Sequence, residues 1–495
     1  MMKVLLVNAA SPTYQAYYNK ARCTLANGLL YIAATLERAG HEVQIYDGFV
    51  DERKPEDFVE WKPALIGFSV IAGPYLEGSI LQSKQFKALL PDVKIAWGNL
   101  QPTVLPAQCV IEPYVDFVVM GAGEYTMLDL VTHLETGTPA LSEIKGLGYK
   151  VDGKPVINER RPFIKNLDEL PDPAWHLVKM ERYSEIGLST SRGCAYKCAY
   201  CYHSAFDRGY ASELSAERVV EQLERVQKLY NAKFVRFNED NFAFNRKRLR
   251  QVCKILIERK NKVKWACESR ADLSEADIIL MKKAGCVAMG LGPETGSQRM
   301  LDFIQKGISL EQMEKTFWLL TKHKIRIVIY LIYGFPTETV EDMKSTRSML
   351  DRLDNPAYLL SRFIPIPGSV LYDYCVNNNL IKAPQSLEEW PEFIVSHGHK
   401  VNLSQVPQEM IDEYVAHFNH TYAKVRFMFT VRHNPAYFLL AFTNPAKLYR
   451  EMKELLKYHL HMNKLQKIRR EQYASVFNGK SVSPEPASLK PRCST

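Results

Sequence analysis

Two successive series of short apolar segments, separated by segments with helical spacing, constrain the fold of this 495-residue chain most strongly. The first series occupies residues 1–145, where a helical segment at 27–40 ends on a glycine. Its apolar segments lie at 3–8, 42–47, 64–69, 93–98 and 116–121. This alternation predicts an α/β domain with an open, doubly wound, Rossmann-like sheet, in which ligands bind beyond the carboxyl ends of the strands.

Small and polar residues follow three of these predicted strands. They are Ser69, Gly98, Asn99, Gln101, Gly123 and Glu124. Small side chains allow a ligand to approach the backbone closely. We therefore expect these strand ends to suit a large, flat ligand.

The second series occupies residues 184–384 and has a longer period. Its strand candidates lie at 186–191, 233–238, 263–269, 286–292, 325–334 and 357–363. Six strand–helix units predict a partial (βα)6 barrel. In barrels of this kind the chemistry gathers at the carboxyl ends of the strands, and a polar, glycine or proline cluster follows each of the six candidates.

Composition divides the rest of the chain. Residues 146–183 contain a proline-rich stretch and are predicted to be a linker, 385–480 to be a helical region, and 481–495 to be a disordered tail. Within the helical region, Arg432 interrupts the aromatic-rich stretch 427–445, so no membrane span is predicted. These helices either cap the barrel or offer a face to an amphipathic partner or a membrane surface.

The overall composition, with 46% hydrophobic and 24% charged residues, is that of a globular protein. The net charge of +9 is better explained by surface lysines than by an anionic partner. No arginine-rich tract or zinc-finger spacing indicates nucleic acid. The start of the chain does not resemble a signal peptide, and the ten cysteines are not evenly spaced, which together favour a reducing, cytoplasmic setting.

Three of the cysteines, Cys194, Cys198 and Cys201, follow the first predicted barrel strand at spacing C-x3-C-x2-C. Three thiolates can bind three irons of a [4Fe–4S] cluster and leave the fourth iron open, and an open coordination position is typical of a catalytic site. The alternative is a zinc site with His203 as fourth ligand. Zinc is disfavoured because His203 lies only two residues after Cys201 and no second ligand pair is near.

With the aromatic Tyr200 before its last cysteine, this motif resembles that of the radical S-adenosylmethionine superfamily. The resemblance implies a [4Fe–4S] cluster that binds S-adenosylmethionine and cleaves it to methionine and a 5′-deoxyadenosyl radical. It also implies roles for five residues. Tyr200 would pack near the adenine, Glu239 and Asp240 would accept from the methionine amine, Arg270 would pair with the methionine carboxylate, and Glu294 would lie near the ribose or methionyl end.

A Rossmann-like domain directly before such a barrel resembles the cobalamin-binding branch of this superfamily. The stretch 98–103, GNLQPT, is similar to that branch's Gly-Gly-Pro-His-Pro-Thr loop, with Gln101 in place of the histidine, and 121–126, GAGEYT, matches its Gly-Glu segment. The cobalt-ligating motif D-x-H-x-x-G is absent. In that branch the lower face of the cobalt is often left without a histidine, so the resemblance still implies cobalamin, held by the strand-end residues from Ser69 to Glu124 given above. The alternative is a Rossmann-like sheet that binds nothing.

The resemblance implies an oxygen-sensitive, cobalamin-dependent methyltransferase. In that branch one S-adenosylmethionine methylates the corrinoid, and a second yields the radical that activates an unactivated substrate carbon. Two alternatives stay open: the same cofactors in an oxidative cyclisation or ring rearrangement, and a non-catalytic iron–sulfur or cobalamin-binding protein. Methylthiotransferases are disfavoured, because only Cys23 and Cys109 precede residue 190 and a second cluster needs three cysteines.

The implied partners are an external electron donor, such as flavodoxin or ferredoxin, and a substrate that the sequence does not identify. That substrate could be a small molecule, a lipid, a tetrapyrrole or a protein side chain. No individual catalytic residue beyond the cofactor-binding ones is predicted.

Overall fold

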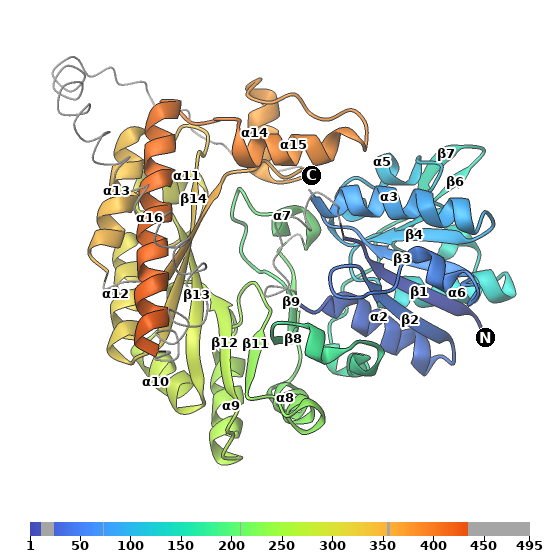
Figure 1. The fold of residues 1–495 in the computed structure, drawn as a ribbon, viewed down its shortest axis with the longest axis horizontal. Helices are drawn as coiled ribbons and strands as arrows, with labels where there is room; N and C mark the ends of the chain where they lie inside the picture. Colours follow the sequence, from blue (N-terminus) through green and yellow to red (C-terminus); the bar gives the residue numbers. More distant parts are fainter. Residues whose placement is uncertain (11–23, 73, 208, 354–356, 434–495) are drawn as a thin grey trace, which may run out of the picture. The chain divides into compact units, whose positions relative to one another are not determined.

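The computed structural model describes residues 1–10, 24–72, 74–207, 209–353 and 357–433. The chain forms two compact units, residues 1–412 and 413–495. The first contains both predicted sheets (Figure 1).

The amino-terminal sheet has seven strands in the order β2-β1-β3-β4-β5-β6-β7. The first five are parallel: β1 (Lys3–Asn8), β2 (Glu42–Asp47), β3 (Leu65–Ser69), β4 (Lys94–Gly98) and β5 (Phe117–Val119). Helix α3 (Pro74–Leu89) lies on one face of the sheet, and α2 (Asn27–Arg38) packs with α6 (Glu124–Thr136) on the other (Figure 1). Two short helices, α4 (Leu100–Val104) and α5 (Pro106–Val110), connect β4 to β5. The predicted doubly wound sheet is confirmed.

The predicted linker is wrong at its beginning, because the sheet continues to Ile157. Strands β6 (Leu147–Val151) and β7 (Lys154–Ile157) form an antiparallel hairpin that pairs with β5. Its turn is Asp152-Gly153, with φ of 50° and 74°. An Asp-Gly pair with positive φ at both residues is a strong hairpin signal, and the sequence reading did not use it. Irregular chain with three short 3-10 turns, η4 (Leu167–Glu169), η5 (Trp175–Leu177) and η6 (Met180–Arg182), completes the connection.

The second sheet has six parallel strands in the order β15-β14-β13-β12-β11-β8. They are β8 (Ile186–Leu188), β11 (Phe234–Phe237), β12 (Lys264–Ser269), β13 (Cys286–Glu294), β14 (Arg326–Tyr333) and β15 (Ala357–Arg362). Each overlaps one of the six predicted strands, so the partial (βα)6 barrel is confirmed.

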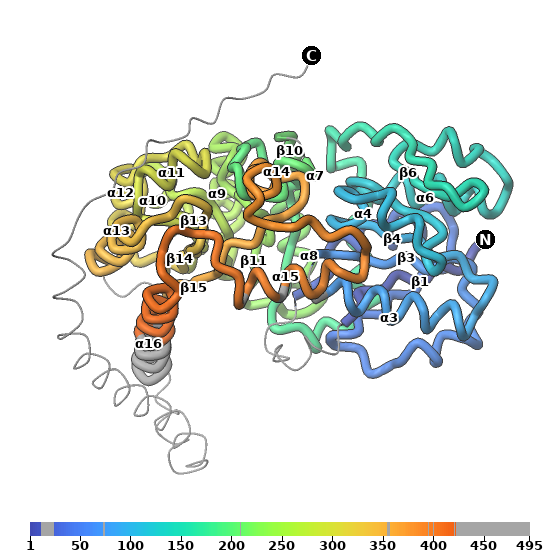
Figure 2. The backbone as a smooth tube through the Cα atoms, turned by 90° about the horizontal axis from the view of Figure 1, so that it is seen from above, coloured from blue at the N-terminus to red at the C-terminus, as the bar shows by residue number. Residues whose placement is uncertain are grey.

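Helices follow the barrel strands along one side of the sheet. They are α8 (Ala216–Tyr230), α9 (Arg246–Glu258), α10 (Glu275–Lys283), α11 (Gln298–Phe303), α12 (Leu310–Lys322) and α13 (Val340–Asp351). Both Figure 1 and Figure 2 place α10, α12 and α13 along the same side of β13 and β14. The residue before each of these six helices accepts a hydrogen bond from a first-turn amide, which stabilises the start of the helix.

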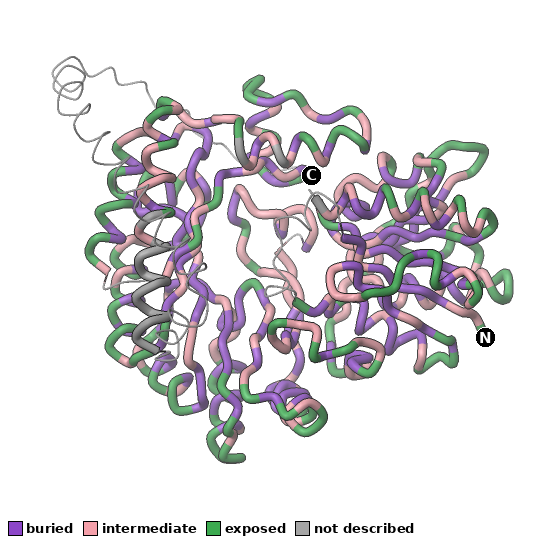
Figure 3. Tube along the Cα trace, in the orientation of Figure 1, coloured by how far each residue is buried: buried purple, intermediate pink, exposed green. Residues whose placement is uncertain are grey.

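The core of the barrel follows the two-residue alternation of its strands. Val235 and Phe237 of β11 and Trp265 of β12 are fully buried, and rings of the last two contact each other. Arg236, between the two buried residues of β11, is only partly buried. In Figure 3 the buried residues accordingly run along the strands of both sheets.

The carboxyl-terminal part of the first unit is helical. Helix α14 (Val370–Asn377) follows β15, and α15 (Glu389–His399) reaches the amino-terminal domain, where the Trp390 indole donates to Gln108 at 2.7 Å. Helix α16 (Gln408–His433) begins in the first unit and continues into the second. Most of the aromatic-rich stretch 427–445 and the whole predicted tail 481–495 lie outside the described residues. Among the described helices, none is long and apolar enough to cross a membrane.

Candidate functional site

The cysteine loop lies between β9 (Ser191–Gly193), which pairs with β10 (Ala211–Glu213), and the short helix α7 (His203–Phe206). Two backbone hydrogen bonds at Ala199 hold the loop in the barrel mouth: its amide donates to Ile304 at 2.8 Å, and its carbonyl accepts from Leu371 at 2.8 Å. The loop is therefore fixed by segments more than 100 residues away in the sequence.

Cys194, Cys198 and Cys201 are free thiols on this loop. Within the described part of the chain, no three His, Cys, Asp or Glu side chains converge as the ligands of a bound metal do. Burial raises the pKa of Cys201 to about 12, and the two neighbouring thiols add to the effect. Three soft sulfur donors on one loop fit an iron–sulfur cluster, whose positive charge would favour their thiolate forms.

Both ring nitrogens of His203 face carboxylate groups. Its Nδ1 pairs with Asp207, and its Nε2 lies 2.8 Å from Asp240. Burial lowers the pKa of His203, but the hydrogen bonds with Asp207 and Asp240 outweigh it and raise the pKa to about 9. With both ring nitrogens engaged in this way, the arrangement does not favour the zinc alternative.

Glu294 and Tyr200 meet in a buried cluster with Lys306. The Tyr200 hydroxyl donates to Glu294 Oε1 at 2.7 Å, and Lys306 Nζ lies 2.8 Å from the same oxygen. Burial raises the pKa of Tyr200. The structure thus brings two of the predicted S-adenosylmethionine-binding residues together. Lys306 was missed, and the only signal for it is the requirement that a buried carboxylate have a cationic partner.

Arg270 is held at the back of the cysteine loop. Its guanidinium lies 3.9 Å from the Tyr196 ring centroid, and its Nη1 is 3.9 Å from Cys198 Sγ. Its Nη2 donates to the carbonyl oxygens of Lys306 at 2.5 Å and Gly307 at 3.2 Å. Contact with a methionine carboxylate stays a prediction.

Glu239 and Asp240 point to different surroundings. Glu239 is buried and accepts from the Thr190 amide at 2.5 Å, and its burial raises its pKa to about 7. Asp240 is half exposed beside His203 and lines a cavity. Of the two predicted acceptors, only Asp240 therefore faces open space.

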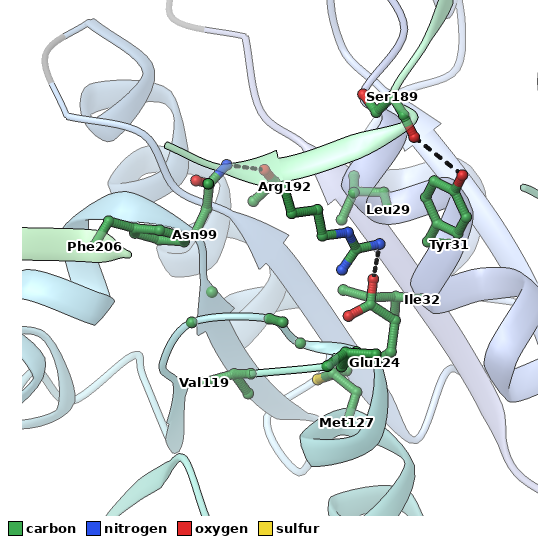
Figure 4. Close-up of a pocket in the computed structure, with 18 of the residues that line it drawn as sticks. Leu29, Tyr31, Ile32, Asn99, Val119, Glu124, Met127, Ser189, Arg192 and Phe206 are labelled. Carbon is green, nitrogen blue, oxygen red and sulfur yellow. Dashed lines mark hydrogen bonds and ion pairs between the residues drawn. The ribbon is translucent and has the colours of Figure 1, made fainter. Parts of the chain in front are cut away.

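This cavity has a volume of about 350 Å³ and lies at the carboxyl ends of β1, β3, β4 and β5 (Figure 4). Five of the six residues predicted to hold cobalamin line it: Ser69, Gly98, Asn99, Gly123 and Glu124. The sixth, Gln101, is not among the lining residues; it is buried, and its Nε2 has no hydrogen-bond partner. The opposite wall comes from the barrel and includes Arg192, Tyr202, His203 and Asp240.

The floor of the cavity fits a flat macrocycle. A Cβ added to Gly121 would meet nothing within 4 Å, and one added to Gly98 would find its nearest atom at 3.7 Å. Backbone without side chains lets a planar ligand approach closely. Among the described lining residues of the amino-terminal sheet and its helices there is no histidine.

Arg192 crosses the cavity from the barrel side, as Figure 4 shows. Its Nη2 lies 2.5 Å from Glu124 Oε1, and its guanidinium lies 4.9 Å from the centroid of the Tyr31 ring. Neither Arg192 nor Tyr31 was predicted. The only signal for Arg192 is its place two residues before Cys194.

Two family models match the chain: the Radical SAM superfamily over residues 188–350 and the B12 binding domain over residues 21–131. The uncharacterized methyltransferase PH0819 of Pyrococcus horikoshii is 31% identical over 394 residues, which cover 77% of this chain and 84% of that protein. The anaerobic magnesium-protoporphyrin IX monomethyl ester cyclase of Rubrivivax gelatinosus is 27% identical, over 69% of this chain and 64% of that protein.

Among solved structures, the fold is similar to that of the radical S-adenosylmethionine methyltransferase TsrM from Kitasatospora setae, determined with tryptophan and a S-adenosylmethionine analogue bound. The TM-score is 0.66 at 16% identity, over 79% of this chain and 83% of that one. At this identity the similarity shows a common fold.

Proposed function

This chain belongs to the cobalamin-dependent radical S-adenosylmethionine enzymes and is a methyltransferase of that family, and we propose that it adds the methyl group to an unactivated carbon of its substrate. One observation carries the proposal. The cavity at the carboxyl ends of the amino-terminal strands also has the cysteine-loop side of the barrel as a wall, through Arg192, Tyr202 and Asp240. A corrinoid and a barrel-bound cofactor would thus open on one shared space.

Within that space, the side chains of the protein would bind the cofactors and orient them. Cys194, Cys198 and Cys201 hold the cluster, and the Tyr200–Glu294–Lys306 cluster supplies polar atoms beside it. When bound, the cluster supplies the electron that cleaves S-adenosylmethionine, and the corrinoid supplies a methyl carrier. Leu29, Ile32 and Phe206 give this space apolar walls. Exclusion of water by bound cofactors and substrate would protect reactive species there from side reactions.

A second candidate function uses the same site for oxidative cyclisation. The similarity to the Rubrivivax gelatinosus cyclase favours it. The products separate the two candidates, because a methyltransferase adds one methyl group and a cyclase removes hydrogen or adds oxygen. The chain's higher identity to the Pyrococcus horikoshii methyltransferase, over a larger share of that protein, supports methyl transfer as the first choice.

We further propose a reducing, cytoplasmic setting and an external one-electron donor, such as flavodoxin or ferredoxin. Support comes from the eight cysteines in the described residues, all of which are free thiols. The substrate class stays open between a small molecule, a lipid, a tetrapyrrole and a protein side chain.

The experiment that tests the function is anaerobic turnover of the cluster- and cobalamin-loaded protein with S-adenosylmethionine and a reductant, followed by mass analysis of the small products. Formation of both S-adenosylhomocysteine and 5′-deoxyadenosine is expected, because each reports one of the two uses of S-adenosylmethionine. If 5′-deoxyadenosine forms alone, the cyclase candidate replaces methyl transfer.

A further inference from the structure

The segment that leads into the cysteine loop is attached to the amino-terminal domain. Ser189 and Arg192 lie five and two residues before Cys194, and each contacts a helix of that domain. Arg192 reaches α6, and Ser189 reaches α2, so the segment is held against both helices that cover the same face of the amino-terminal sheet.

The contact with α6 is a desolvated ion pair. Glu124, the first residue of α6, has a side chain only 2% exposed, and the Arg192 side chain is 24% exposed. Oxygen Oε2 of Glu124 has no hydrogen-bond partner, so Arg192 is the main compensation for a buried charge. Breaking such a pair by removing one partner leaves an uncompensated charge, which is strongly unfavourable.

The contact with α2 is made by Tyr31. Its ring lies under the Arg192 guanidinium, and its hydroxyl donates to the Ser189 carbonyl at 3.1 Å. Gln222 of α8 donates to the same hydroxyl at 3.3 Å. Tyr31 thus connects the amino-terminal domain to the loop-bearing segment and to the first barrel helix.

We propose that Arg192 is a positioning residue: through Glu124 and Tyr31 it fixes the cysteine loop relative to the corrinoid side of the cavity. Methyl transfer needs donor and acceptor at reacting distance, and a displacement of ~1 Å can slow such a step by about 100-fold. Radical formation takes place within the barrel, where the backbone contacts of Ala199 with Ile304 and Leu371 still hold the cysteine loop, so it does not depend on this attachment. The inference rests on the proposed function, because it assumes that a corrinoid occupies the cavity.

The test uses the full chain with Arg192→Gln, loaded with cluster and cobalamin and reduced with titanium(III) citrate. S-adenosylmethionine with a deuterated methyl group reports two reactions without substrate. In the first, the sulfonium–methyl bond breaks, the electron pair of cob(I)alamin forms the cobalt–carbon bond, and S-adenosylhomocysteine leaves. In the second, one electron from the cluster breaks the bond between the sulfonium sulfur and C5′, methionine leaves, and the 5′-deoxyadenosyl radical takes a hydrogen atom from a carbon–hydrogen bond of the protein or the buffer to give 5′-deoxyadenosine.

We expect Arg192→Gln to slow methyl transfer to cobalt at least about tenfold, with 5′-deoxyadenosine formation unchanged. Arg192→Lys, which keeps the charge but not the planar stacking group, should restore part of the rate. The matched control is Arg161→Gln. Arg161 pairs with Asp129 on the same helix α6, and its side chain is 22% exposed, but it does not line the cavity. The Arg161→Gln variant should carry out both reactions at the wild-type rates.

A second measurement needs no cofactor. Hydrogen–deuterium exchange over residues 189–201 should be faster in Arg192→Gln than in the wild type and in Arg161→Gln, because the attachment is lost. If Arg192→Gln does not fold, Tyr31→Phe removes the hydroxyl contacts with Ser189 and Gln222 but keeps the ring under Arg192, and it should shift exchange and methyl transfer in the same direction, by less.

Unchanged exchange, or an equal slowing of both reactions, would overturn the inference. A wild-type protein that binds no cobalamin would instead contradict the proposed function, and the exchange comparison would still decide whether Arg192 holds the loop.

Discussion

Lys306 and Glu294 form an ion pair of 2.8 Å in which the two side chains are only 9% and 8% exposed. Glu294 ends β13, and Lys306 follows α11, so the pair closes one strand–helix unit of the barrel. Tyr200, next to the last cysteine, bonds to both. The cluster loop and the fourth barrel unit are thereby connected by polar contacts in a nearly dry environment.

Lys306→Met should destabilise the apoprotein by about 3 kcal/mol, because it leaves the Glu294 carboxylate buried without its cation. Chemical unfolding of the anaerobic apoprotein measures the effect. The double variant Lys306→Met/Glu294→Gln should recover part of the loss, since the uncompensated charge is gone. If adding Glu294→Gln instead lowers the free energy of unfolding by as much as it does in the wild-type protein, the two residues do not act as a pair.

Cys198→Ala should abolish assembly of the iron–sulfur cluster, because two thiolates remain for a cluster that needs three. Iron and sulfide content after anaerobic reconstitution, with the visible absorbance of the cluster, measures it. The control is Cys375→Ala, since Cys375 is a buried free thiol on α14, away from the loop. A Cys198→Ala protein that still binds four irons would refute the ligand assignment.

Stability should depend on pH through Glu338. Burial raises the pKa of this carboxyl group from 4.5 to about 8, although the Gly334 amide donates to it at 2.5 Å. The unfolded chain therefore releases this proton first, and between about pH 4.5 and 8 the free energy of unfolding falls as pH rises. The contribution of Glu338 to the free energy of unfolding is fully present below about pH 4.5 and lost above about pH 8. It amounts to about 1.4 kcal/mol for each unit by which the pKa is raised.

Glu338→Gln cannot ionise and should flatten this part of the pH dependence. The measurement is the difference between the unfolding free energies of wild type and variant at several pH values in that window. Identical slopes for the two proteins would show that Glu338 is ionised in the folded state.

Asn99→Gly should stabilise the protein by about 1 kcal/mol. Asn99 has φ of 81° and ψ of −152°, a region that costs a residue with a side chain of order 1–3 kcal/mol and is open to glycine. Loss of the 3.0 Å hydrogen bond from Asn99 Nδ2 to Ser69 Oγ offsets part of the gain. Thermal unfolding of the apoprotein measures the balance, and a lower midpoint in the variant would mean that the hydrogen bond outweighs the strain.

The sequence predicted those parts of the fold that depend on local pattern. The barrel strands β11 and β14 alternate buried and less buried residues and are followed by polar, glycine or proline clusters, so their positions followed from the pattern. The hairpin β6–β7 was missed because the proline-rich stretch in 146–183 indicated a linker, and the Asp152-Gly153 turn was not recognised. Five cavity residues were predicted because small residues at strand ends face the ligand side of such a sheet.

The contacts between distant residues could not be predicted in the same way. Lys306 lies 106 residues from Tyr200, and the hydroxyl of Tyr31 meets the Ser189 carbonyl across 158 residues. No spacing rule connects such pairs, because they meet only when the barrel closes and the two domains pack. Glu239 and Asp240 illustrate the same limit: adjacent residues after one strand turn to opposite surroundings.

The central claim, that the cluster and the corrinoid share one site, is tested most directly by measuring the magnetic interaction between them. The reduced cluster and cob(II)alamin both carry unpaired electrons, so the wild-type protein loaded with both can be measured by electron paramagnetic resonance. The account predicts a dipolar interaction between the two centres, because Gly193 and Tyr202, which flank the three cysteines in the sequence, line the cavity at the ends of the amino-terminal strands. Two spectra that simply add, with both centres present in full amount, would contradict a shared site.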